Sequence, residues 1–173
     1  MLGTIIKSIQ WSTLKKCTLH NDNYGFKPQL TQPIPFGVKE LFIGNCSFVS
    51  ATPGCLPSSI TRLTLLDAKG LKQGDIPTSV KWLEMRYAST LANDLQVLPS
   101  SIRNLQLRNT KIQPDVHITM FPKSIISMKI VLSRVTLKLI RLNDDLYFRN
   151  GPSINEYGFI SSSSAQSILI AAQ

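Results

Sequence analysis

Five eleven-residue segments of the chain align with one another without gaps, and each begins with an apolar residue followed by proline. The copies are IPFGVKELFIG, LPSSITRLTLL, IPTSVKWLEMR, LPSSIRNLQLR and FPKSIISMKIV, at 34–44, 56–66, 76–86, 98–108 and 121–131. A degenerate copy around Leu14 precedes them, so six copies cover roughly residues 12–133. Successive copies begin 20 to 23 residues apart. Repeats of this length indicate a solenoid in which each unit packs mainly on its two neighbours.

Each copy ends in alternating apolar residues, which is the side-chain period of a β-strand. A short strand cannot bury its face alone, so we expect stacked coils to pair their strands in a parallel sheet, about 4.8 Å apart. The proline before each strand costs no hydrogen bond of the sheet, and a nearby serine can bond neighbouring backbone. These serines are Ser59, Ser79, Ser101 and Ser124. The expected fold is a β-rich repeat solenoid, leucine-rich-repeat-like, with short parallel strands on the concave face, an irregular convex side and capped ends.

The alignment of the copies predicts the core as rows of apolar residues that stack from coil to coil. The strand rows are Leu14, Val38, Ile60, Val80, Ile102 and Ile125; Cys17, Leu41, Leu63, Leu83, Leu105 and Met128; and Leu19, Ile43, Leu65, Met85, Leu107 and Ile130. The row before the prolines is Ile34, Leu56, Ile76, Leu98 and Phe121, and a return-side row is Phe26, Val49, Leu71, Leu91 and Ile112. Cys17 is therefore expected to be a core residue and not a nucleophile.

The repeat resembles the FNIP repeat family, a leucine-rich-repeat relative whose units run Phe-Asn-x-x-Leu and then Ile-Pro-x-Ser-Val-x-x-Leu-x-Leu. The segment from Phe26 to Leu30, followed by Ile34-Pro35, is similar to the full unit. The later copies keep only the second half of the unit. The resemblance implies a non-catalytic interaction scaffold.

The segments that flank the repeats are expected to cover the open ends of the sheet, because exposed strand edges promote aggregation. Residues 1–11 are expected to close the first coil. Residues 134–149 are interpreted as a cap of two antiparallel strands around a turn at 143–145, with a helix over 134–142 as the alternative. The solenoid thus occupies 1–149. The Ser-, Asn- and Gly-rich segment 150–173 is expected to be a loosely ordered tail, with a frayed or back-packed end at 168–172.

The composition restricts the class of protein. Apolar residues make up 43% of the chain and charged residues 17%, which is too apolar for a disordered chain. No run of about 18 apolar residues is present, so we expect no membrane insertion. The odd cysteine count, with Cys17, Cys46 and Cys55, is no disulfide framework and favours reduced thiols in a cytosolic or nuclear protein, of which we expect the cytoplasmic location. The sequence also lacks the common catalytic, phosphate-binding and zinc-binding motifs, so we expect no enzyme, no cofactor and no metal.

The net charge of +9 is spread along the chain. Residues 1–33 carry +3, residues 34–122 carry +3, residues 123–149 carry +4 and the remainder carries −1. A nucleic-acid-binding protein usually concentrates its basic residues. A basic polyanion- or nucleic-acid-binding module is therefore the alternative function, and nucleic acid is not the partner that the charge distribution favours.

The residues that alternate with the strand leucines are expected to point outward from the concave face. They form three columns, namely Lys16, Glu40, Arg62, Trp82, Asn104 and Ser127; Thr18, Phe42, Thr64, Glu84, Gln106 and Lys129; and His20, Gly44, Leu66, Arg86, Arg108 and Val131. The central part of these columns is the predicted partner-binding site. Its residues are Glu40, Phe42, Arg62, Thr64, Trp82, Glu84, Arg86, Asn104, Gln106 and Arg108.

Two features of this face suggest what it binds. Trp82 is either a binding anchor or a ring covered by Arg62 stacked over it. Arg86 and Arg108 stand on adjacent coils, where their like charges repel each other. This repulsion can be offset by Glu84, by solvent, or by an acidic or phosphorylated partner. The predicted function is a protein–protein interaction scaffold that binds another protein through the concave face.

Overall fold

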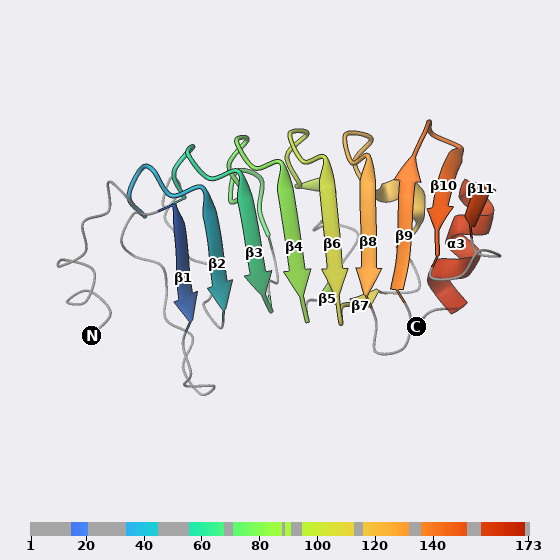
Figure 1. The fold of residues 1–173 in the computed structure, drawn as a ribbon, viewed down its shortest axis with the longest axis horizontal. Helices are drawn as coiled ribbons and strands as arrows, with labels where there is room; N and C mark the ends of the chain where they lie inside the picture. The colour runs from blue at the N-terminus through green and yellow to red at the C-terminus, as the bar shows by residue number, and fades with distance from the viewer. Residues whose placement is uncertain are drawn as a thin grey trace.

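The computed structural model describes residues 15–20, 34–44, 56–67, 71–87, 89–90, 95–112, 116–131, 136–151 and 157–171. The main element of the described structure is one nine-stranded sheet with the order β1-β2-β3-β4-β6-β8-β9-β10-β11 (Figure 1). The first six strands in this order are parallel, and each comes from one copy of the repeat. They are β1 (Lys16–His20), β2 (Glu40–Gly44), β3 (Arg62–Leu66), β4 (Trp82–Arg86), β6 (Asn104–Arg108) and β8 (Ser127–Val131).

The register of the parallel strands places equivalent residues of successive copies opposite one another. Leu41 is paired with Leu63, which is paired with Leu83, and the same alignment continues to Met128. A sheet with one buried face specifies its register strongly, because a slip of one residue would move every leucine into solvent. The prediction of a β-rich repeat solenoid with short parallel strands is confirmed.

The predicted core rows form the interior behind this sheet. From the second coil onward every member of the three strand rows and of the row before the prolines is buried. In the first coil Cys17 and Leu19 are half-buried, because β1 has a partner strand on one side only among the described residues. Leu14 and the terminal segment 1–11 lie outside the described residues.

The return side of the coils is less regular than the sheet. Two short strands, β5 (Ser89–Thr90) and β7 (Lys111–Ile112), pair in parallel behind the main sheet, and a 3₁₀ turn, η3 (Ile118–Met120), follows them. Leu71 is buried as predicted. Leu95, Val116 and Ile118 are also buried, although the predicted row did not include them. The predicted positions Phe26, Val49 and Leu91 lie outside the described residues.

The serines before the strands follow the prediction in two of four coils. The Ser59 and Ser101 hydroxyls donate to the carbonyl oxygens of Val38 and Val80 in the preceding coil, at 2.9 and 2.8 Å. The hydroxyls of Ser79 and Ser124 are buried without a hydrogen-bond partner among the described residues. Serine hydroxyls therefore form hydrogen bonds between neighbouring coils at Ser59 and Ser101 and not at Ser79 and Ser124, among the described residues.

The end of the repeat is capped by antiparallel strands. Strand β9 (Thr136–Arg141) pairs antiparallel with β8 and with β10 (Leu146–Asn150). In the turn between them, the Asn143 side-chain oxygen accepts the N–H groups of Asp145 and Leu146, both at 2.9 Å. The predicted pair of strands is confirmed, and the helical alternative for 134–142 is wrong over the described residues of that segment.

The expectation of a loosely ordered tail is wrong for residues 157–171. Strand β11 (Tyr157–Ser161) pairs antiparallel with β10, and helix α3 (Ser162–Ala171) follows it directly. The Ser161 hydroxyl accepts the Ser164 N–H at 3.2 Å, which is the bond of a helix N-cap. Ala165 and Leu169 are buried, so the helix packs back onto the core, although the serine-rich composition of its first turn is typical of a loose tail.

Candidate binding face of the sheet

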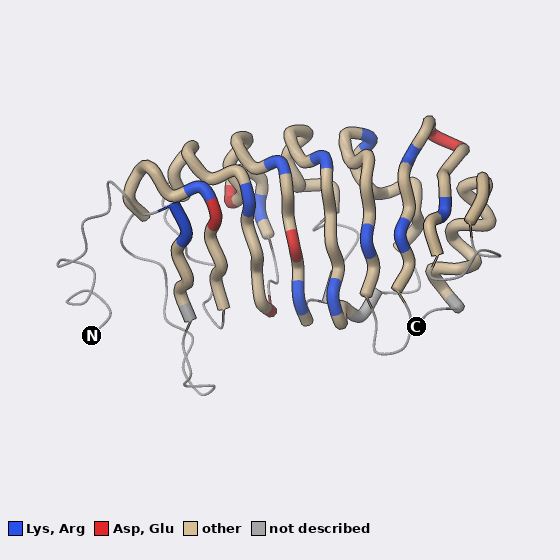
Figure 2. The backbone as a smooth tube through the Cα atoms, in the orientation of Figure 1, with Lys and Arg blue, Asp and Glu red and all other residues tan. Residues whose placement is uncertain are grey.

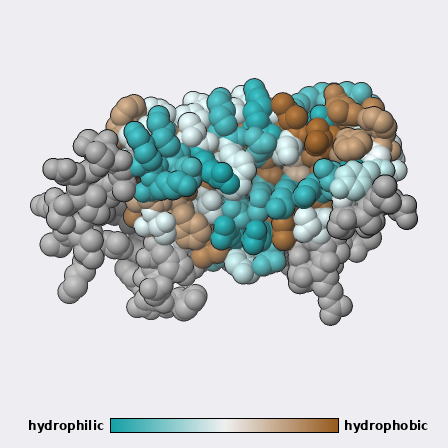
Figure 3. All heavy atoms as spheres, viewed as in Figure 1, coloured by the Kyte–Doolittle hydropathy of each residue, from teal (hydrophilic) through white to brown (hydrophobic). Residues whose placement is uncertain are grey.

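The predicted outward columns lie side by side on the sheet. Arg62 is paired with Trp82 and Trp82 with Asn104 in the first column, and Arg86 is paired with Arg108 in the third. In the second column Phe42 is followed by Thr64, Glu84 and Gln106. We call the ten residues predicted to bind a partner the outer sheet face. Hydrophilic side chains gather over the central strands in the space-filling view (Figure 3).

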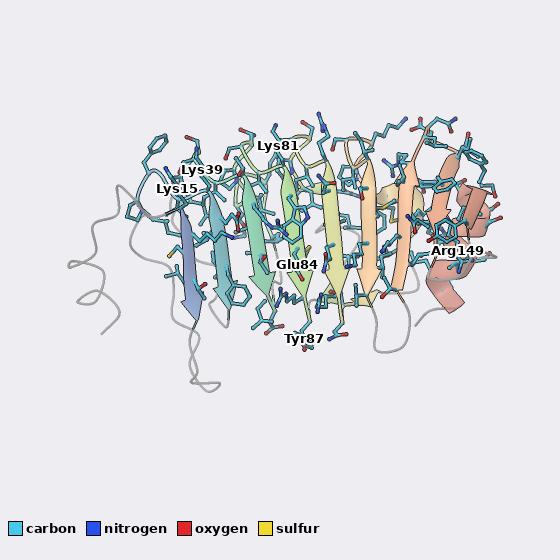
Figure 4. All side chains as sticks on the ribbon, viewed as in Figure 1. Lys15, Lys39, Lys81, Glu84, Tyr87 and Arg149 are labelled. Atoms are coloured by element: carbon cyan, nitrogen blue, oxygen red, sulfur yellow. The ribbon has the colours of Figure 1, made fainter. Side chains whose placement is uncertain are left out.

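A buried carboxylate lies at the centre of the outer sheet face. Glu84 stands in the middle of β4 (Figure 4), and its side chain is only 5% exposed. The Arg86 guanidinium donates to both carboxylate oxygens, at 2.8 and 3.1 Å, and the Gln106 amide donates at 3.2 Å. Arg108 Nε lies 3.4 Å from Glu84 Oε1, close enough for an ion pair but without hydrogen-bond geometry. The negative charge of Glu84 therefore offsets the electrostatic repulsion between Arg86 and Arg108.

The network explains how a carboxylate is buried on a face predicted to be solvated. Taking an ionised group out of water is costly unless charged donors surround it, and here two guanidinium groups do so. The Arg86 and Arg108 side chains remain 34% and 42% exposed. One anion between two cations leaves one net positive charge at the centre of the face.

Arginine side chains also cover the aromatic residues of this face. The Arg62 guanidinium lies 3.7 Å from the centre of the Trp82 ring, and that of Arg86 lies 5.6 Å from the centre of the Phe42 ring. Such cation–π contacts stabilise by about 0.5–1 kcal/mol at exposed sites. The Trp82 ring is therefore covered by a guanidinium group and is not an exposed binding anchor. On this face, guanidinium groups lie over the rings of Trp82 and Phe42.

A shallow hollow of about 120 Å³ lies beside this cluster, lined by Glu40, Phe42, Arg62 and Thr64 together with residues of β1. It is smaller than the ~300 Å³ at which small-molecule pockets begin. The Glu40 carboxylate pairs with Lys16 at 3.0 Å, and both side chains are well exposed. Burial raises the pKa of the nearby Cys17 thiol, which disfavours the nucleophilic thiolate at neutral pH. The hollow therefore lacks the volume of a small-molecule pocket, and the thiol beside it is not activated as a nucleophile.

The outward columns predicted from the sequence do not include one group of basic residues. Lys15, Lys39, Lys81 and Arg103 each stand one residue before a parallel strand, and all are exposed. The signal was present in the aligned copies, where the residue after the first apolar strand row is basic in four of six. These residues lie beside the outer sheet face, at the edge where the strands begin.

The fold and this face define a repeat solenoid with an ordered polar and aromatic sheet surface. Comparison of the chain with protein-family models, curated proteins and solved structures finds no match. Among the described residues no group of three or more His, Cys, Asp or Glu side chains is placed to hold a metal ion. No helix within the described ranges has the length and apolar character needed to cross a membrane.

Proposed function

We propose that the protein is a non-catalytic scaffold that binds another protein through the outer sheet face. The observation that supports this proposal is the Glu84 network, in which Glu84 hydrogen-bonds Arg86 and lies within ion-pair distance of Arg108 on the sheet surface. The same proposal includes membership of the FNIP repeat family, which the aligned repeat residues support. It also includes a cytoplasmic location.

Preorganisation is the physical reason that such a face suits binding. Immobilising a flexible side chain at an interface costs about 0.5–1.5 kcal/mol, and arginine is among the most flexible residues. Here Arg86 is held at both carboxylate oxygens and Arg62 is stacked on Trp82 before any partner arrives. Tryptophan and arginine are also the residues that most often dominate interface energetics.

The charge of the face indicates the chemistry of the partner. The guanidinium groups of Arg86 and Arg108 keep exposed edges, and the centre of the face carries one net positive charge. Planar guanidinium groups match carboxylate and phosphate oxygens. The partner is therefore expected to present an acidic or phosphorylated surface to these guanidinium groups.

The test is proximity labelling in the native cell with three forms of the chain. The face variant carries Trp82→Ala and Arg108→Glu. The control carries Tyr157→Ala and Lys72→Glu, which remove an exposed aromatic residue and reverse a charge elsewhere on the surface. We expect the face variant to lose labelled proteins that the wild type and the control retain. An unchanged set of labelled proteins would show that this face is not the binding site.

A further inference from the structure

A row of cations follows the edge of the sheet at which the parallel strands begin. The row consists of four cations, Lys15, Lys39, Lys81 and Arg103, with the uncharged Thr61 between Lys39 and Lys81, and we call it the basic ridge. Backbone hydrogen bonds join each member to the next coil, because each N–H donates to the carbonyl oxygen of the preceding member at 2.8–2.9 Å. Figure 2 shows basic residues along these upper strand ends, and Figure 4 labels three of them.

The backbone at the ridge turns these side chains into solvent. In the second coil the N–H groups of Lys39 and Glu40 both donate to the Lys15 carbonyl oxygen, at 2.9 Å each, and later coils repeat this arrangement. Val38 and Leu41 on either side are both buried, so two residues separate consecutive core positions where one would be expected. This local break in the alternation resembles a β-bulge and leaves an extra exposed residue in every coil.

The ridge cations have no ion pair with a carboxylate of any described residue. Glu40, the acidic residue beside Lys39, pairs with Lys16. The Arg103 guanidinium donates to main-chain carbonyl oxygens, among them that of Ser100 at 2.7 Å. The outer sheet face therefore balances most of its charges internally, whereas the ridge leaves four positive charges facing solvent.

The spacing of these charges is set by the sheet. Neighbouring strands are about 4.8 Å apart, so the four steps from Lys15 to Arg103 extend over about 19 Å. Stacked nucleotides place one phosphate per strand at about every 3.4 Å, so this length matches five to six phosphates. A row of four positive charges along one edge of the sheet thus has the form that a linear polyanion complements.

We propose that the basic ridge binds the phosphate backbone of a single-stranded nucleic acid, at a site separate from the outer sheet face. Lysine ammonium groups contact phosphates as point charges, and a flexible single strand can follow a straight ridge. Phe36, which is 74% exposed, lies in the turn that leads to Lys39 and offers one ring on which a base can stack. Contacts of this kind read no sequence, so the binding is non-specific.

In the sequence alone, the even spread of charge does not favour nucleic acid as a partner. In the stacked coils, however, basic residues 20 or more positions apart become neighbours at one edge of the sheet. The ridge therefore meets the requirement for concentrated positive charge in space, although the chain does not meet it in sequence.

The test is fluorescence anisotropy with a labelled twelve-nucleotide oligo(dT) from 50 to 200 mM KCl. Four phosphate contacts predict a slope of log affinity against log salt of about −2.8, which is about a 50-fold loss over this range. The variant Lys39→Gln/Lys81→Gln should have a slope of about −1.4, or about a 7-fold loss. The control Lys72→Gln/Lys138→Gln removes the same charge from exposed positions off the ridge and should keep the wild-type slope.

Three outcomes would overturn the proposal. The first is no binding at 50 mM salt, and the second is an equal change in slope for the ridge variant and the control, which would indicate diffuse attraction. The third is preferential binding of a duplex, of inorganic polyphosphate or of an acidic peptide of equal charge over oligo(dT). None of these outcomes bears on the outer sheet face, since neither variant alters it.

Discussion

The parallel coils and the C-terminal cap belong to one sheet but are built on different principles. In the coils, strands β1 to β8 of the main sheet run in one direction, and each residue has an equivalent in the next coil. In the cap, β9, β10 and β11 alternate in direction and no repeat relates them. The coils are stabilised by equivalent contacts that recur from copy to copy, whereas the contacts that hold the cap on the last coil each occur once.

The contacts of the cap show this dependence on single residues. The Arg141 guanidinium donates to the carbonyl oxygens of Pro122 and Phe121, at 2.8 and 3.2 Å, and so joins β9 to the last coil. The Gln166 side chain accepts the Ile118 N–H at 2.7 Å and donates to the Val116 carbonyl oxygen at 3.2 Å. Loss of either residue would affect the cap in a way that no neighbouring copy could compensate.

The two regions also differ in the surface that they present. The polar first column of the coils continues across the cap as Ile140, Phe148 and Phe159, which are cross-strand neighbours. The rings of Phe148 and Phe159 are 5.5 Å apart in an edge-to-face arrangement, and Phe159 is 70% exposed. Figure 3 shows hydrophobic side chains over the beginning of this region, around β8 and β9. The change from charged to apolar coincides with the end of the repeat.

The largest expected effect is on the core of the coils. Leu83→Ala removes a fully buried side chain of β4 and should lower the free energy of unfolding by about 2–5 kcal/mol, as measured by urea denaturation. Leu169→Ala in α3 should cost less, because α3 packs mainly on η3, β10 and β11 among the described elements and can detach locally. A loss for Leu169→Ala equal to that for Leu83→Ala would contradict this difference between coil and cap.

The next effect concerns the docking of α3. Gln166→Ala leaves the Ile118 N–H and the Val116 carbonyl oxygen without their partner, which should cost about 1–3 kcal/mol. Hydrogen exchange at the Ile118 amide should accelerate, while exchange in β4 stays unchanged. Ser167→Ala is the matched control, because among the described residues the Ser167 hydroxyl donates within the helix, to the Ser163 carbonyl oxygen. Equal exchange rates in both variants would exclude this role for Gln166.

A smaller effect compares ion pairs in the two regions. Glu84→Gln in the coils should cost about 1–2 kcal/mol, because Arg86 and Arg108 lose the anion between them while water still reaches both guanidinium groups. Asp144→Asn in the cap breaks the exposed pair with Lys123 and should cost no more than about 0.5 kcal/mol. Thermal unfolding at low and high salt measures both. Equal costs would mean that the Glu84 network is an ordinary surface contact.

The smallest expected effect distinguishes coils that share the same motif. Ser101→Ala removes the bond to the Val80 carbonyl oxygen and should cost about 1 kcal/mol. Ser79→Ala removes a buried hydroxyl without a partner among the described residues, so its effect should be close to zero or stabilising. Denaturant midpoints of the two variants give the comparison, and a larger loss for Ser79→Ala would be inconsistent with these bonds.

The repeat made most of the fold predictable. Once the copies were aligned, the position of Leu83 in its copy implied both its burial and its pairing with Leu63 and Leu105. The outward position of Glu84 followed in the same way. Its burial did not, because burial depends on how the side chains of Arg86, Gln106 and Arg108 settle around it, and strand period carries no information about that.

The amino-acid sequence by itself determined the solenoid, its register and the rows of its core, because a periodic pattern has one arrangement that buries every apolar row at once. Only the tertiary structure decided that 157–171 form a strand and a helix, that Glu84 lies between two arginines and that Lys39 and Lys81 share a ridge. Each of these depends on contacts between residues distant in the chain. Their geometry exists only after the coils have stacked.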